Sequence, residues 1–221
     1  MNDSRVLSVN VGQPIEVLAG HRPVLTSIFK SPIARRVAVH RHNLEGDRQA
    51  DLRVHGGPYK AVYAYPSEHY SYWAAELPDL SFPFGAFGEN LTTFGLTEDA
   101  VQIGERFRIG SAILEVTQPR MPCFKLGLRF GRSDMVKRFW KSGHSGFYLA
   151  VMQEGELGPG DAIEKLADMQ PDGISVAEVV GLYQGAITDS DLFDRALRAP
   201  LRGSWKNDIR ELRAQRSLPL F

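Results

Sequence analysis

The chain has 221 residues, with 26 Lys and Arg against 26 Asp and Glu, so its formal net charge is zero. This balance argues against a dedicated nucleic-acid-binding or membrane-surface protein. Hydrophobic residues make up 43% and charged residues 24% of the chain, which is ordinary for a globular protein with a sizeable core. The single cysteine cannot form an internal disulfide, and neither a signal peptide nor an apolar run long enough to span a bilayer is found. We therefore expect a soluble cytoplasmic protein.

Short β-rich segments separated by Gly and Pro dominate the first third of the chain. They occupy residues 6–11, 15–18, 24–29, 37–39 and 61–65. Such a rhythm is typical of an antiparallel barrel or sandwich. The polar segment 45–53 is expected to form an ordered loop. A helix is expected over 66–77, because Tyr70, Trp73 and Leu77 follow helical spacing.

The segment 54–60 contains the pair Gly56 and Gly57, which permits positive φ angles and close approach of a ligand to the backbone. Basic side chains surround the pair in the sequence: Arg48, Arg53, His55 and Lys60. Successive backbone N–H groups in such a loop can bind an anion, and this charge would suit a phosphate. The alternative is a glycine turn with solvated charges, which a lone Gly-Gly pair favours.

Glu89 and Asn90 stand at the start of a further predicted strand, after an aromatic loop at 82–87. A carboxylate beside an amide can hydrogen-bond the edge of a heterocycle. The alternative is an ordinary turn, because Asn and related residues favour turns.

A strand expected over 112–117 leads into the segment 118–125, which holds Cys123. Pro119 and Pro122 stiffen the backbone, so neither a helix nor a central strand is expected to continue here. Arg120 and Lys125 bracket the thiol, and nearby cations favour the thiolate, which is the nucleophile and the metal ligand. The alternative is a cysteine that only packs in the core. With the flanking charges and prolines taken into account, a reactive thiol and a buried packing residue are equally supported at this point. The choice between them depends on the rest of the chain.

The second half adds a short helix over 133–140 and strands over 147–152 and 163–166. A linker at 168–173 is followed by helical periodicity, with a capping box at Ser175 and Glu178. Three helices are expected in this part, over 175–183, 189–198 and 203–216. The chain is therefore predicted to consist of a β-rich domain at 1–167 and a small three-helix domain at 174–216, whose basic end is a candidate docking surface.

Four stretches in order resemble the MOSC family, the molybdenum-cofactor sulfurase C-terminal domain. They are His55-Gly56-Gly57, 60–63, 87–92 and 119–126. Within that family the chain is similar to the bacterial hydroxylaminopurine-resistance proteins, which carry a three-helix tail, and the resemblance covers nearly the whole chain. It implies a mostly β MOSC-type barrel with flanking short helices, followed by the three-helix domain. It also implies a molybdenum cofactor, molybdopterin, in a deep basic pocket.

The resemblance also implies roles for individual residues. Cys123 would be the catalytic residue and would give its thiolate to molybdenum, a soft ligand suited to such a centre. The other residues assigned to cofactor binding are His55, Gly56, Gly57, Lys60, Glu89, Asn90, Arg120 and Lys125. Glu89 and Asn90 would orient the pterin or the substrate. The implied reaction reduces an N-hydroxylated base by two electrons to its amine and releases water. Electrons would come from a separate reductase, because one cysteine cannot hold an iron–sulfur cluster.

The sequence leaves other functions open. One alternative is a non-catalytic carrier that binds the cofactor without turnover. Another is a sulfur carrier in which Cys123 bears a persulfide. A thiol hydrolase with Cys123 and either His55 or His144 as base lacks a sequence signature. A zinc site is disfavoured by the absence of a cysteine pair. Neither nucleic acid nor membrane is an expected partner, and an oligomer is possible.

Overall fold

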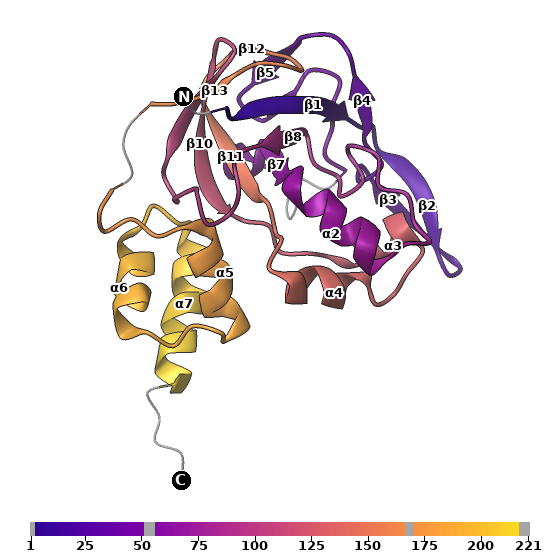
Figure 1. Cartoon of the computed structure of the whole chain (residues 1–221). Helices are drawn as coiled ribbons and strands as arrows, with labels where there is room; N and C mark the ends of the chain where they lie inside the picture. Colours follow the sequence, from indigo (N-terminus) through magenta and orange to yellow (C-terminus); the bar gives the residue numbers. More distant parts are fainter. Residues whose placement is uncertain (1–2, 51–55, 167–169, 217–221) are drawn as a thin grey trace.

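The computed structural model describes residues 3–50, 56–166 and 170–216, which form a mixed α/β fold (Figure 1). The large sheet has eight strands, in the spatial order β13 (Ile163–Lys165), β9 (Arg106–Ile109), β10 (Ala112–Pro119), β11 (Phe147–Gln153), β7 (Val62–Pro66), β8 (Leu91–Phe94), β1 (Arg5–Val11) and β4 (Ser31–Ile33). A smaller sheet contains β12 (Gly155–Leu157), β5 (Val37–His40) and β6 (Asn43–Leu44), and a hairpin joins β2 (Ile15–Ala19) to β3 (Arg22–Thr26). Only the pair β7 and β8 in the large sheet is parallel.

The large sheet is not the closed barrel that the sequence predicts, because its ladders leave β13 and β4 as edges. The edge at β13 approaches β1, the neighbour of β4, at one point. The amide of Val6 donates to the carbonyl of Asp161 at 2.9 Å, that of Ile163 donates to Ser4 at 2.8 Å, and Arg5 forms an isolated bridge with Ala162. Further pairing is blocked because β4 occupies the rest of that edge of β1, over Val9–Val11. The result is a strongly curved sheet joined at a single bridge.

Helices cover the sheet on one side and at one end (Figure 1). They are the 3-10 helix η1 (Pro58–Lys60) and the α-helices α2 (Glu68–Glu76), α3 (Phe124–Phe130), α4 (Met135–Ser142), α5 (Val176–Gln184), α6 (Ser190–Arg198) and α7 (Gly203–Arg216). The capping box predicted at the start of α5 is confirmed: Ser175 Oγ accepts from the amide of Glu178, and the Glu178 carboxylate accepts from the amide of Ser175. None of the helices in the described residues combines the length and apolar character needed to cross a membrane.

The expectation that residues 118–125 exclude both a helix and a central strand is wrong, because a strand occupies the beginning of this segment and a helix its end. Strand β10, which lies between β9 and β11, extends through Pro119, where the missing N–H is tolerated because the strand ends there. Helix α3 begins at Phe124, directly after Cys123, and ends at Gly131 in the left-handed conformation that favours glycine.

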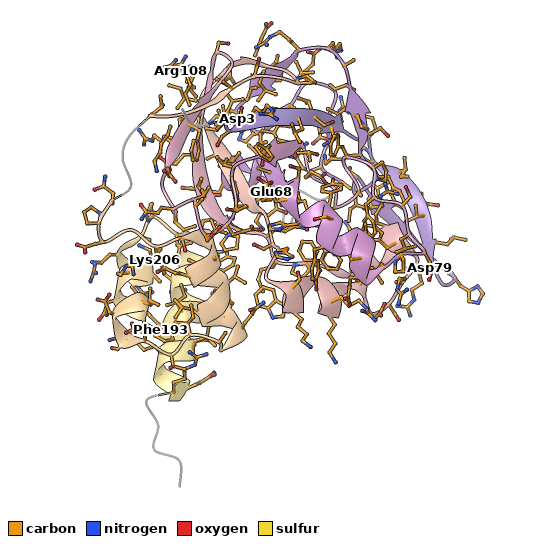
Figure 2. The ribbon with its side chains drawn as sticks, in the orientation of Figure 1. Asp3, Glu68, Asp79, Arg108, Phe193 and Lys206 are labelled. Carbon is orange, nitrogen blue, oxygen red and sulfur yellow. The ribbon has the colours of Figure 1, made fainter. Side chains whose placement is uncertain are left out.

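The apolar interior falls into two groups. The larger lies against the sheet and continues into α5–α7, where it includes Val176, Val179, Phe193 and Ile209; Figure 2 shows Phe193 within this helical layer. The smaller is aromatic and packs around Tyr65, between β7, α2 and α4. Because the larger group is continuous, the division into domains at 1–167 and 174–216 stays a prediction.

Candidate functional site

An open pocket with about 560 Å³ of empty space lies beside the end of β10. Segments far apart in the sequence converge on it. The lining residues are Thr26, Ser27, Ile28, Lys30, Arg48, Gln49, Ala50, Gly88, Arg120, Met121, Cys123, Lys125 and Tyr148. Among the described residues, no Asp or Glu lines the pocket, whereas four cationic side chains do. The pocket is therefore suited to an anionic ligand.

Cys123 is placed on the pocket wall by the junction of β10 and α3. It is the residue immediately before α3, its side chain makes no capping hydrogen bond, and it is half-buried. Its neighbours Met121 and Phe124 are 45% and 57% exposed, and Cys123 itself is one of the residues that line the pocket. A half-buried position on a pocket wall argues against the alternative in which the cysteine only packs in the core, and the role of Cys123 stays a prediction.

Arg120 and Lys60 bring positive charge to the thiol. The buried Arg120 guanidinium donates from Nη1 to the Tyr63 hydroxyl at 3.2 Å and to the Phe87 carbonyl at 2.5 Å, which fixes its orientation. Lys60 Nζ lies 5.7 Å from the ring centre of Tyr148 on the pocket wall. Burial lowers the pKa of Lys60, and the neighbouring Arg202 lowers it further, whereas a charge on Cys123 raises it.

Lys30 is a pocket residue that the sequence does not reveal. Its ammonium pairs with the carboxylate of Asp47, which also accepts from the Gly12 amide and from Asn90 Nδ2, both at 2.8 Å. Burial lowers the pKa of Lys30, and Asp47 opposes this effect. Nothing in the local sequence marks Lys30, because its partner lies in the polar segment 17 residues later.

Glu89 and Asn90 do not line the pocket. The buried Glu89 carboxylate accepts from the amides of Gly85 and Phe87, at 2.8 and 3.0 Å, and also from the Tyr70 hydroxyl. Burial raises the pKa of Glu89, while these donors lower it. Asn90 Oδ1 accepts from the Tyr63 amide at 3.1 Å. Both side chains are therefore committed to contacts within the protein that fix the loop and strand behind the pocket.

The glycine segment is adjacent to the site but is not part of the pocket lining. Gly57 has φ 88° and ψ 172°, a conformation open only to glycine, and precedes η1. Gly56 is buried. His55 lies outside the described residues. Of this segment, Lys60 is the residue that the structure brings towards Cys123.

Two further features of the lining bear on what the pocket can hold. Ser27 Oγ is buried and has no hydrogen-bond partner among the described residues. Gly88 has φ 78°, and a Cβ there would lie 2.8 Å from Ile28 Cγ1. A buried polar atom without a partner is expected where a polar ligand completes a site, whereas the glycine at position 88 is required by the close packing of Ile28.

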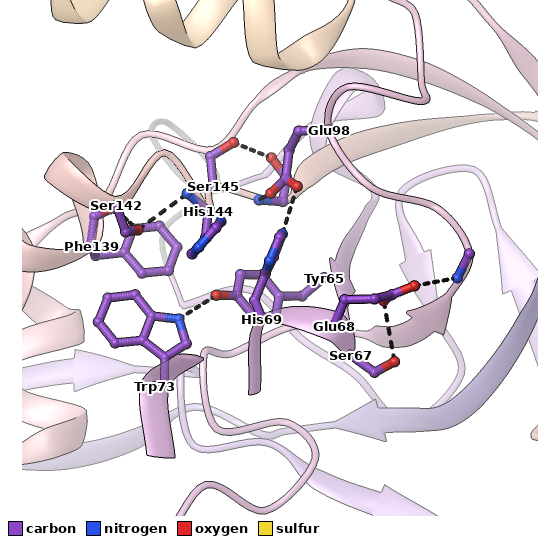
Figure 3. Close-up of polar contacts among 12 residues, drawn as sticks. Tyr65, Ser67, Glu68, His69, Trp73, Glu98, Phe139, Ser142, His144 and Ser145 are labelled. Atoms are coloured by element: carbon purple, nitrogen blue, oxygen red, sulfur yellow. Dashed lines mark hydrogen bonds and ion pairs between the residues drawn. The ribbon is translucent and has the colours of Figure 1, made fainter. Parts of the chain in front are cut away.

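A second polar cluster contains His69 of α2, Glu98 and His144, none of which lines the pocket (Figure 3). His69 Nε2 lies 2.6 Å from Glu98 Oε2, and the imidazole of His69 stacks on that of His144 with ring centres 3.9 Å apart. Burial lowers the pKa of His144, the charge of His69 adds to this shift, and Glu98 opposes it. This places His144 beside His69 in a buried cluster, where its ring is engaged by another imidazole.

Comparison with known proteins gives one family and several relatives. Residues 51–164 match the MOSC domain model. The uncharacterized protein YflK of Bacillus subtilis is 42% identical over 202 residues, which cover 91% of this chain and 90% of YflK. The crystal structure of YiiM from Geobacillus stearothermophilus aligns with a TM-score of 0.77 at 33% identity, covering 95% of this chain and 99% of that one. A Gibberella moniliformis protein named Reductase is 39% identical over 130 residues, which are 57% of this chain and 23% of that protein.

Proposed function

The chain belongs to the MOSC domain family, and from that premise we propose that it is a molybdenum-cofactor-dependent reductase of N-hydroxylated bases. The substrate would be a small molecule bearing a hydroxylamino group. Two electrons and two protons convert this group to an amine and water. The observation that carries the proposal is the half-buried Cys123 thiol on the wall of a pocket lined by cations.

The residues present fit such a cofactor. Lys30, Arg48, Arg120 and Lys125 line the pocket and would offset the negative charge of a phosphate and a dithiolene. The described residues contain no group of three or more His, Cys, Asp or Glu side chains placed to hold a metal ion. A metal held by Cys123 would therefore need further ligands from its own cofactor, as molybdopterin provides. The unpartnered Ser27 hydroxyl would donate to the same ligand.

When bound, the cofactor supplies the two-electron redox chemistry. The chain's residues would hold and orient it. The Cys123 sulfur is the soft ligand, and Arg120, fixed by Tyr63 and Phe87, keeps a positive charge at the sulfur. Glu89 and Asn90, which we assigned to the pterin or substrate from sequence, would act from behind the pocket by fixing Tyr70 and Asp47. Lys60 and His55 would add to the cationic side, and Gly56 and Gly57 would let the ligand approach the backbone closely.

The relative named Reductase supports an oxidoreductase, and the electrons would come from a separate reductase. The basic end of the three-helix segment remains our candidate for its docking surface. We place the reaction in the cytoplasm, without a nucleic-acid or membrane partner. The second candidate function is a cofactor or sulfur carrier, which would use the same Cys123 as a thiolate or as a persulfide.

The test compares wild type with Cys123→Ser, both purified from a host that makes the cofactor. We expect about one molybdenum per wild-type chain and reduction of a hydroxylamino purine with an artificial donor, and at least tenfold less of both in the variant. The exposed Lys137→Gln serves as a control that leaves the pocket intact. Molybdenum without turnover in wild type favours the carrier. Equal molybdenum content and turnover in Cys123→Ser contradicts the proposal.

A further inference from the structure

The His69–Glu98–His144 cluster is connected to the pocket through the backbone of Gly146. Glu98 Oε2 contacts His69, and its other oxygen, Oε1, accepts from the Gly146 amide at 2.6 Å. The carbonyl of Gly146 in turn accepts from the backbone amide of Arg120 at 3.3 Å. A continuous series of hydrogen bonds therefore runs from helix α2 to the residue three positions before Cys123.

A parallel connection passes through side chains. The Tyr63 hydroxyl donates to the carbonyl of Ser145 at 2.8 Å and accepts from Arg120 Nη1 at 3.2 Å. Thus both the backbone and the guanidinium of Arg120 are positioned by the turn at Ser145 and Gly146. A displacement of this turn would move Arg120 relative to Cys123.

The turn has little freedom of its own. Gly146 has φ 60°, and a Cβ there would lie 2.5 Å from the carbonyl oxygen of Ala64 and 2.8 Å from the Tyr63 ring. The residue is thus pressed against β7, and the Glu98 carboxylate is the acceptor that holds its amide. Because Glu98 is itself buried, its second oxygen depends on His69 for compensation.

We propose that Glu98 is a positioning residue for Arg120 and that protonation of His144, which is stacked on His69, weakens the hold of Glu98 on the Gly146 amide. The inference rests on the proposed function only in taking the Cys123 pocket as the active site. One oxygen of the Glu98 carboxylate contacts His69, and the other accepts from the Gly146 amide. A proton on His144 would place a positive charge near this carboxylate, and their attraction would compete with the hydrogen bond from the Gly146 amide.

The groups that face the pair come from several elements. His69 faces Glu98 and Tyr65, whose ring meets it edge to face, and its charge also acts on Asp99. His144 faces His69 and the edge of Tyr72, and the charge of Glu98 acts on it. Glu98 is thus the carboxylate placed to respond to both imidazoles.

Cys123 is the only cysteine of the chain, so alkylation by iodoacetamide reports on the pocket without any bound cofactor. Rate constants are measured from pH 5 to pH 8 on the cofactor-free full chain. Each variant's rate constant is divided by that of wild type at the same pH. The pH dependence that the two proteins share cancels in this ratio. The variants are Glu98→Gln and His144→Phe. The control is Glu76→Gln, because Glu76 lies on the same helix as His69 but its exposed carboxylate pairs with Arg138.

We expect the ratio for Glu98→Gln and for His144→Phe to change at least threefold between pH 5 and pH 7, and that for Glu76→Gln to stay constant. Constant ratios in both cluster variants overturn the inference. If Glu98→Gln does not fold, His144→Phe decides alone, because it leaves the bond between Glu98 and Gly146 intact. Since no cofactor is involved, the outcome is independent of whether the chain reduces N-hydroxylated bases.

Discussion

Lys30, which lines the Cys123 pocket, forms an ion pair with Asp47 behind the pocket wall, and the two side chains are only 8% and 1% exposed. Asp47 also accepts from the Gly12 amide and from Asn90, so a single carboxylate joins the end of β1, the start of β8 and a pocket cation. A buried pair adds little net stability compared with apolar side chains, but removing one partner leaves an uncompensated charge. The pair is therefore best explained by the need to hold a cation at the pocket.

Asp47→Asn should reduce the free energy of unfolding by about 3–5 kcal/mol, because it leaves the Lys30 ammonium without its counter-charge. Lys30→Met should cost less, because Asp47 keeps two N–H donors. Urea unfolding monitored by tryptophan fluorescence measures both. Glu45→Gln is the matched control, since Glu45 forms an exposed ion pair with Arg35 and its loss should leave stability unchanged. An Asp47→Asn variant as stable as this control would refute the argument.

Under the proposed function, Gly88→Ala should reduce molybdenum content, whereas a glycine substitution with similar backbone strain away from the pocket should reduce only stability. A Cβ at Gly88 would lie 2.8 Å from Ile28 Cγ1, and both residues line the pocket, so the side chain of Ile28 must shift. The left-handed backbone adds about 1–2 kcal/mol of strain. Gly131→Ala carries similar strain at φ 63° but meets no atom within 4 Å. Metal analysis and thermal unfolding of both variants separate the effects, and equal molybdenum loss in the two would contradict a role of Gly88 in the pocket.

The sequence indicates the β-rich character, the capping box at Ser175 and the family, because each depends on local pattern or on motifs in order. Helix α3 is not predicted from the same patterns, since Pro119 and Pro122 suggest an extended loop and the helix begins only two residues after the second proline. Its signal is modest: Leu126 and Phe130 lie one turn apart, and Gly131 follows as the C-terminal cap.

For the site, the sequence points to Cys123, Arg120 and Lys125, because they adjoin one another along the chain. It does not point to Lys30, whose position on the wall depends on a contact with Asp47, 17 residues away. It also suggests that Glu89 is a ligand-facing carboxylate. Only the packing of the aromatic loop shows that its oxygens are occupied by backbone amides. Local sequence does not reveal which polar side chains turn inward.

The stability of the protein should fall as the pH drops below 6.5. Burial lowers the pKa of His144 from its ordinary 6.5, with a further contribution from His69. Between the lowered value and 6.5, the unfolded chain binds more protons than the folded one, so stability is present above this window and is lost as the pH decreases through it. Unfolding free energies at several pH values between 5 and 7.5 measure the slope. His144→Phe should show a shallower slope, and an identical slope would exclude His144 as its source.

Ile209→Ala in α7 should lower the stability of the whole chain in a single transition, by about 2–5 kcal/mol. Ile209 is fully buried in the apolar group that also contains Val101 and residues of the sheet. The backbone joins the two parts as well: Ile103 donates to the carbonyl of Ile174 at 3.0 Å, and Val176 donates to that of Val101 at 2.9 Å. Calorimetry measures the number of transitions. A separate low-temperature transition, with that of the sheet unchanged, would instead establish residues 174–216 as an independent domain. In that case, the helices and the sheet would not share one cooperative core. Binding of a partner to the helices would then not change the pocket through packing between these two parts.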